Sequence, residues 1–239
     1  EMARSDSSIR TIIPESNKTT GNIGIEYLIF KFRLNIYAEH FYKISHNLLG
    51  LKGTKIENIK DVYSHAQAIS QSSEYIKKNN LIGHVRADTA GSAKFVSDYK
   101  DKTKAAIASS LSAEIYDLEI IGSDIQDNKE NFTRFLLMGK DIVQPENDTN
   151  LYITSFLFKL KSKPAALYSA LQGMAINGVN MIKLQSFPEK NSFSSYFFLC
   201  EVEGHIENQK IKNSLEDLNY HCEDMSVLGV FKADKLRKK

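Results

Sequence analysis

The sequence predicts a protein of two domains: an α/β domain over residues 1–148 and a smaller α+β domain over 149–234, followed by a basic tail over 235–239. Three observations support this prediction. A chain of 239 residues is long enough for two domains of about 100–150 residues each. Its 42% apolar and 10% aromatic content supports hydrophobic cores. The polar stretch 144–150, which contains Pro145 and no apolar periodicity, separates two strand-like runs and marks the boundary.

Apolar strand-like runs alternate with helical stretches before this boundary. Alternation of this kind is typical of α/β architecture, in which strands form a central sheet and helices cover it. The strands are predicted over residues 10–14, 81–86 and 104–109, and the helices over 66–79 and 91–100.

The elements after the boundary come in the order β-α-β-β-α-β. Residues 151–161 alternate as a strand does, and a helix is predicted to open at Pro164, whose missing N–H suits a first helical position. Gly178 can end this helix in a left-handed conformation. The order is that of a ferredoxin-like sandwich, with two helices on one face of an antiparallel sheet. Its remaining elements are strands over 181–187 and 195–203, a helix that carries Ile211, Leu215 and Leu218, and a last strand over 222–231.

Composition and charge exclude several functional classes. Lysine and arginine exceed aspartate and glutamate by 31 − 29 = 2, and the charges are scattered, so the sequence carries no electrostatic footprint for nucleic acid. No apolar run approaches the roughly 18–20 residues that span a bilayer, and no signal peptide opens the sequence, which predicts a cytoplasmic protein without membrane association. Cys200 and Cys222 lack metal-ligand spacing and are predicted to be reduced thiols. The basic tail is predicted to be a solvated end.

Five short segments of the first domain place hydroxyls, amides and one histidine where a strand or loop passes into a helix. Helix starts attract carboxylates through their N–H groups and dipoles, so several converging starts predict a site for a small anion. The alternative is that each polar residue only caps its own helix. The segments are Pro14–Gly21, Tyr63–Ala68, Asp88–Ala93, Gly122–Asp124 and Asn131–Phe135.

Several of these segments resemble motifs of one family. Tyr63-Ser64-His65-Ala66-Gln67-Ala68 is similar to the S-H-P-Q-A-L segment of the prephenate dehydratases, and Asp88–Ala93 is similar to their D-T-A-x-A stretch. Asn131-Phe132-Thr133-Arg134-Phe135 matches their N-x-T-R-F, and residues 44–49 fall where the family has I-x-H-x-L-L. The resemblance covers nearly all of residues 9–231, in the order and spacing of the family.

The resemblance implies a fold and a reaction. The catalytic domain would be two-lobed and similar to periplasmic binding proteins, and it would be incomplete at its N-terminus, because the family's first strand and G-P-x-G-T-x-S turn have no counterpart here. The implied reaction converts prephenate to phenylpyruvate with loss of carbon dioxide and the ring hydroxyl, in phenylalanine biosynthesis, and it needs no metal or cofactor. The threonine of T-R-F is the family's main catalytic residue, which implies that Thr133 donates a hydrogen bond to the leaving hydroxyl.

The resemblance also implies which residues hold the two carboxylates of the substrate. Arg134 could pair with a carboxylate through its guanidinium fork, or it could form a structural ion pair. His65 is either a second donor or a structural histidine. The family's P-x-E-N-S-x-x-G segment reads Pro14-Glu15-Ser16-Asn17-Lys18-Thr19-Thr20-Gly21 here, which keeps the asparagine. Lys18 replaces the serine of that segment, and it either attracts a carboxylate or blocks the pocket. The full set of substrate-binding candidates is Asn17, Ser64, His65, Thr89, Ser92 and Arg134.

The second domain resembles the ACT domains that sense phenylalanine. The family's G-A-L segment reads Ala165-Ala166-Leu167 here, and its E-S-R-P segment reads Gln185-Ser186-Phe187-Pro188. The added methyl group of Ala165 and the lost charges predict a degenerate effector site that binds L-phenylalanine weakly or not at all. Pairing of ACT sheets would give a homodimer or tetramer. The predicted effector residues are Ala165, Ala166, Leu167, Gln185 and Ser186.

Two other function classes stay open at this point. The main alternative is a catalytically impaired relative that binds an amino acid or keto acid and acts in regulation, because the N-terminal motif is missing and Lys18 is present. An exported solute-binding protein would share the two-lobed α/β shape, but the sequence shows no signal peptide.

Overall fold

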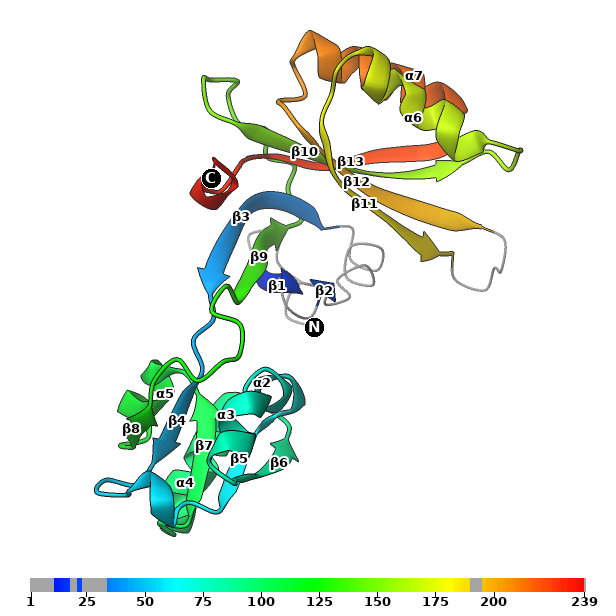
Figure 1. Ribbon diagram of the computed structural model, residues 1–239. Helices are drawn as coiled ribbons and strands as arrows, with labels where there is room; N and C mark the ends of the chain where they lie inside the picture. The colour runs from blue at the N-terminus through cyan, green and yellow to red at the C-terminus, as the bar shows by residue number, and fades with distance from the viewer. Residues whose placement is uncertain (1–10, 18–20, 23–33, 190–194, 239) are drawn as a thin grey trace. The chain divides into compact units, whose positions relative to one another are not determined.

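The computed structural model describes residues 11–17, 21–22, 34–189 and 195–238 (Figure 1). The chain divides into two compact units. Of the described residues, the first unit takes 11–15, 34–41, 134–189 and 195–238, and the second takes 16–17, 21–22 and 42–133. The units differ from the predicted domains, because several strands from the first 148 residues belong to the same unit as the C-terminal sheet. The domain bounds 1–148 and 149–234 stay a prediction.

The C-terminal part of the first unit has the predicted order β-α-β-β-α-β. Its antiparallel sheet has the strand order β11-β12-β10-β13. Helices α6 and α7 lie side by side over one face of this sheet (Figure 1). The elements are β10 (Tyr152–Leu160), α6 (Ala166–Ile176), β11 (Met181–Pro188), β12 (Tyr196–Glu203), α7 (Gln209–His221) and β13 (Cys222–Lys232), and a 3-10 helix, η3 (Lys235–Lys238), follows them.

Parts of β1, β3 and β9 that belong to the first unit pack against the other face of the sandwich and form part of a second sheet. Its strand order is β2-β1-β9-β3, with bounds β1 (Thr11–Asn17), β2 (Gly21–Asn22), β3 (Asn35–Lys43) and β9 (Phe132–Gly139). Within the first unit, Ile36 and Met138 of this sheet pack against Ile153 and Leu199 of the sandwich sheet. Phe156 and Cys200 face the opposite way, into the core beneath α6 and α7. Because successive side chains of a strand point to opposite faces, the alternation of β10 and β12 fills both cores.

Gly229 of β13 lies against the backbone of Ile36 in β3. A Cβ atom at this position would overlap the backbone carbonyl oxygen of Ile36, which cannot move aside as a flexible side chain can. We therefore expect Gly229→Ala to lower the free energy of unfolding by about 1–3 kcal/mol, the usual cost of overpacking. Urea denaturation measures this change. Ser226→Ala, at an exposed position of the same strand, is the control and should stay within about 0.5 kcal/mol of the parent; equal stability of the two variants would contradict the close approach.

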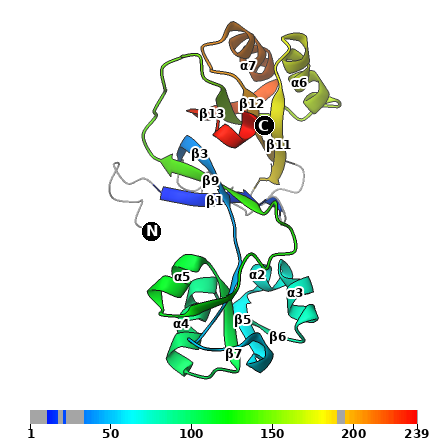
Figure 2. The ribbon, with the colours of Figure 1, turned by 60° about the vertical axis from the view of Figure 1, so that its left-hand side comes forward.

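The second unit is a five-stranded sheet with helices on both faces. Its strand order is β6-β5-β7-β4-β8. Leu48 and Ile107 face a core that includes Ala68 of α2, whereas Leu49 and Ala106 face a core that includes Val96 of α4. Figure 2 shows α2 and α3 on one side of the sheet and α4 and α5 on the other. The elements are β4 (Asn47–Gly50), η2 (Ile56–Asn58), β5 (Asp61–His65), α2 (Ala66–Ser70), α3 (Ser73–Lys78), β6 (Ile82–Arg86), α4 (Thr89–Tyr99), β7 (Lys104–Ala108), α5 (Ser110–Ile115) and β8 (Glu119–Gly122).

Two predicted helices differ from those observed. The helix predicted over residues 66–79 is divided into α2 and α3, because the carboxylate of Asp127 accepts hydrogen bonds from Ser73 Oγ (2.8 Å) and Glu74 N (3.1 Å) and so starts a new helix. The helix predicted to open at Pro164 begins at Ala166, because Ala165 takes a left-handed conformation with φ of 58°. No helix in the described part of the chain is both long and apolar enough to cross a membrane.

Candidate functional site

Polar residues follow the ends of three neighbouring strands in the second unit. β5 pairs in parallel with both β6 and β7, so the carboxyl ends of these strands lie at one edge of the sheet. Helices α2, α4 and α5 begin directly beyond this edge. β4 runs antiparallel to β7, with Asn47 opposite Ala108, so the residues that enter β4 reach the same edge. We call this region the polar edge; its helix starts favour negatively charged groups.

His65 lies at the polar edge as the N-cap of α2. Its Nδ1 atom accepts a hydrogen bond from Gln67 N at 3.3 Å. This is the helix-capping role that the sequence left open as an alternative. When Nδ1 of a neutral imidazole accepts a hydrogen bond, the ring proton is on Nε2. The half-buried His65 side chain can therefore cap the helix with Nδ1 and still donate a hydrogen bond from Nε2. Thr89 is the first residue of α4 and is also half-buried.

Ser64 and Ser92 lie in the packing behind this edge. Both residues are 0% exposed. The Ser64 hydroxyl donates to the carbonyl of Ile107 at 2.6 Å, and the Ser92 hydroxyl donates to the carbonyl of Asp88 at 2.7 Å. Each hydroxyl proton is therefore engaged with the backbone. These two candidates hold β5 to β7 and the start of α4 in place, and neither could contact a substrate without leaving its present packing.

Three further residues, outside the predicted set of substrate-binding residues, form a hydrogen-bonded group. The Gln71 Oε1 atom lies 2.8 Å from His46 Nε2 and accepts a hydrogen bond from Asn131 Nδ2 at 3.1 Å. Asn131 is 0% exposed and His46 is 7% exposed. Burial lowers the pKa of His46, although its hydrogen bond to Gln71 acts in the opposite direction. A neutral His46 that donates from Nε2 fits this arrangement.

The sequence did contain a signal for this group. Each of its members lies in or beside a motif that resembles the family: His46 in I-x-H-x-L-L, Asn131 in N-x-T-R-F, and Gln71 three residues after Tyr63–Ala68. What the sequence could not show is that the three side chains meet, because they lie up to 131 − 46 = 85 residues apart.

Thr133 follows this group along the chain, near the start of β9. It is 6% exposed. Asn131 immediately precedes the strand, and its carbonyl accepts a hydrogen bond from Ile44 N at 2.8 Å. Together with the side-chain bond to Gln71, this contact fastens the start of β9 to the polar edge. The predicted convergence of Thr133 with the other substrate-binding candidates stays a prediction.

Arg134, the next residue of β9, is buried among carboxylates of the protein. It is 4% exposed, and its guanidinium contacts Glu39 (2.7 Å), Glu201 (3.0 Å) and Glu15 (3.3 Å). The structure thus places Arg134 in the structural ion pair that the sequence left open as the alternative to substrate binding. Asn17 belongs to β1, where its backbone pairs with Gly21. Its side chain and Lys18 fall outside the part of the chain that the structure describes.

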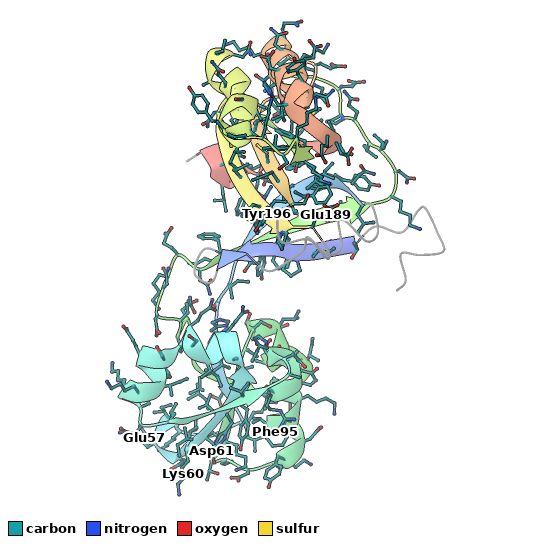
Figure 3. All side chains as sticks on the ribbon, turned by 90° about the vertical axis from the view of Figure 1, so that its right-hand side faces the viewer. Glu57, Lys60, Asp61, Phe95, Glu189 and Tyr196 are labelled. Carbon is teal, nitrogen blue, oxygen red and sulfur yellow. The ribbon has the colours of Figure 1, made fainter. Side chains whose placement is uncertain are left out.

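A pocket of about 420 Å³ lies on the sandwich, at the start of α6. Ala165, Ala166 and Leu167 line it, as do Lys161 and Glu223. Tyr196, at the start of β12, is a further lining residue and is labelled in Figure 3. The other two predicted effector residues, Gln185 and Ser186, lie on β11 and are not among the lining residues. The predicted effector set is therefore divided between this pocket and a strand.

Comparison with known proteins relates this chain to the prephenate dehydratases. Residues 1–142 match the family model described as prephenate dehydratase. The chain is 35% identical over 231 residues to a prephenate dehydratase of Methanocaldococcus jannaschii, an alignment that covers 95% of this chain and 83% of the relative. It is 34% identical over 224 residues to a bifunctional N-acyl-homoserine lactone acylase/prephenate dehydratase of Komagataeibacter europaeus, with 93% and 80% covered.

One solved structure has a similar fold over almost the whole of this chain. A structure described as GqqA, a novel type of quorum quenching acylase, superposes with a TM-score of 0.88 at 33% identity. The superposition covers 95% of this chain and 83% of that one.

Proposed function

Since this chain belongs to the prephenate dehydratase family, we propose that it converts prephenate to phenylpyruvate, carbon dioxide and water, in phenylalanine biosynthesis. The observation that carries the proposal is the family match over residues 1–142, which includes Asn131-Phe132-Thr133-Arg134-Phe135. The bond between the ring and its carboxylate breaks, its electron pair enters the ring, and the hydroxyl opposite departs and takes up a proton. Aromatisation of the ring drives the reaction. The protein therefore has to bind and orient prephenate and to stabilise the departing hydroxyl.

Thr133 is the residue we assign to the leaving hydroxyl. A threonine hydroxyl does not ionise near neutral pH, so it acts by donating a hydrogen bond to the departing oxygen. Its burial at 6% exposed supports this role, because a donor held away from bulk water interacts more strongly with developing charge. We assign carboxylate binding to the polar edge, where Thr89 and the Nε2 of His65 are donors beside helix starts.

Purified protein incubated with prephenate provides the test. We expect phenylpyruvate, measured by chromatography, to form at a rate proportional to protein concentration. The rival function, an amino-acid- or keto-acid-binding regulatory relative, predicts something different: calorimetry would show heat of binding for prephenate or an amino acid while no phenylpyruvate accumulates.

We also propose that the sandwich is an ACT-type regulatory domain whose effector pocket is the one at the start of α6. The pocket combines apolar side chains with Lys161 and Glu223, a composition that suits an amino acid zwitterion with an apolar side chain. Pairing of two such domains through sheet edges would give a homodimer or tetramer, which sedimentation velocity distinguishes from a monomer.

Ala165→Gly tests the effector site. A left-handed conformation costs a residue with a Cβ atom about 1–2 kcal/mol, and glycine adds about 0.5–1 kcal/mol of chain entropy to the unfolded state. We therefore expect the substitution to raise the free energy of unfolding by on the order of 0.5 kcal/mol and to tighten L-phenylalanine binding in calorimetry, because the backbone N–H groups become more accessible.

The matched control is Ala166→Gly, one residue further along. Ala166 is the first residue of α6, where glycine should cost about 0.5–1 kcal/mol of stability. If Ala165→Gly destabilises the protein as much as Ala166→Gly, the strain at Ala165 is not released. If the parent already binds L-phenylalanine at micromolar concentration, the methyl group does not restrict the site.

A further inference from the structure

Six charged side chains lie together inside the first unit, where β1, β3 and β9 pack against the sandwich. The carboxylates are almost fully buried: the side chains of Glu15, Glu39 and Glu201 are 2%, 0% and 1% exposed. Their charges are balanced by an equal number of cations, which is what makes such burial tolerable. We call these residues the buried charge cluster; its cations are Arg134, Lys183 and Arg237.

Arg134 is held in one orientation by this cluster. Its Nε atom donates to Glu39 Oε2 at 2.7 Å, while Nη1 lies 3.0 Å from Glu201 and 3.3 Å from Glu15. A guanidinium is planar and its donors point in fixed directions, so the carboxylates at two of its nitrogens, Nε and Nη1, restrict how the side chain is turned. Arg134 is bonded directly to Thr133 in β9.

The C-terminal segment completes the cluster. Arg237 donates two hydrogen bonds to Glu39, from Nε to Oε1 at 2.6 Å and from Nη2 to Oε2 at 2.8 Å. The Asp234 N–H donates to the same Glu39 Oε1 at 3.0 Å, and the Asp234 carboxylate accepts from Phe41 N at 3.2 Å. The prediction that the basic tail is a solvated end is therefore wrong for Arg237, whose side chain is 19% exposed.

Glu39 is the residue that joins the two arginines. Its Oε2 atom accepts from Arg134 Nε and from Arg237 Nη2, so the same oxygen is shared. Burial opposes its ionisation, but the Arg237 hydrogen bond and the neighbouring charges hold the pKa of Glu39 below its usual value. Without Arg237, the carboxylates would outnumber the cations in a region that water hardly reaches, and Glu39 would lose the partner that fixes its position.

We propose that Arg237 is a positioning residue for the reaction, acting through Glu39 and Arg134 to set the direction of the Thr133 side chain. Neighbouring residues of a strand point to opposite faces, so the rotation of the strand about its axis at Arg134 also determines where Thr133 points. Catalysis by one oriented donor is sensitive to displacements of about 1 Å, which can cost on the order of 100-fold in rate. The inference rests on the proposed dehydratase function.

Arg237→Gln is the test variant. We expect kcat for phenylpyruvate formation to fall by about 10- to 100-fold while KM for prephenate stays within about threefold, because the carboxylate-binding groups of the polar edge are untouched. Arg237→Lys keeps the charge without the fork and should recover part of kcat. The control is Lys232→Gln, which also removes a cation near the C-terminus. Lys232 Nζ lies 2.8 Å from Asp148 Oδ2, and both side chains are exposed. The kcat of this variant should stay within about twofold of the parent value.

A second readout separates this inference from the proposed function. All variants are assayed at a temperature where circular dichroism shows them fully folded, and amide hydrogen exchange is followed for peptides that span residues 131–137. Arg237→Gln should speed exchange there, whereas Lys232→Gln should not. If the parent makes no phenylpyruvate, the proposed function fails, and the exchange data still decide whether Arg237 orders β9. An Arg237→Gln protein with parental kcat, or with parental exchange over 131–137, would overturn the inference.

Discussion

Replacing Thr133 with valine should lower kcat for phenylpyruvate formation by on the order of 10²–10³ while leaving the protein folded. Expulsion of a hydroxyl without a hydrogen-bond donor is unfavourable, and one positioned donor typically contributes a factor of this size. Valine keeps the branched shape of threonine and removes only the hydroxyl, so the packing around this 6%-exposed residue changes little. Steady-state kinetics give the rate, and thermal denaturation shows that the fold is retained.

Thr133→Ser is the matched control for that experiment. Serine keeps the hydroxyl and loses one methyl group, so it should retain far more activity than valine even if it packs less well. If Thr133→Val turns over prephenate within a fewfold of the parent, the hydroxyl has only a structural role, and the family's central threonine does not act in this chain.

Replacing Arg134 with glutamine should lower the free energy of unfolding by about 3–5 kcal/mol, the usual result of removing one partner from a buried ion pair. The substitution leaves Glu15, Glu39 and Glu201 facing each other with too few cations. Urea denaturation measures the loss. The control is Arg86→Gln, an exposed arginine whose guanidinium lies 4.1 Å from the Phe95 ring centroid, which should cost no more than about 1 kcal/mol.

The pH dependence of stability gives an independent check on the same cluster. Because the pKa of Glu39 is lower in the folded state, its contribution is present above its unfolded pKa of 4.5 and is lost as the pH falls through the lower folded value. The parent should therefore lose stability in this acidic range, and Arg134→Gln should lose less.

If Arg134→Gln is as stable as the parent but has a KM for prephenate raised more than about tenfold, the arginine binds substrate after all.

The sequence predicted most of the sandwich correctly because its elements have strong periodic signals. Ile211, Leu215 and Leu218 recur along one face of α7 and are buried there. Gly178, expected to end the first helix, has a left-handed φ of 65°. Local patterns of this kind depend on neighbours three or four residues away, which the sequence displays directly.

Features made by distant residues could not be predicted in the same way. The division of the helix over 66–79 depends on Asp127, which caps α3 from more than 40 residues away. Four basic residues at the C-terminus predict a solvated tail, yet Arg237 pairs with Glu39, 198 residues earlier in the chain. The choice between the two roles of Arg134 likewise needed the positions of three glutamates from different strands.

Aromatisation of prephenate by this chain releases two products that can be followed in the same sample. Purified protein is mixed with prephenate at neutral pH, and carbon dioxide and phenylpyruvate are measured over time beside a sample without protein. We expect both products to form together in a 1:1 ratio, at a rate proportional to protein concentration, and we expect Thr133→Val to remove most of this rate. Prephenate that remains intact in the presence of folded, prephenate-binding protein would contradict it.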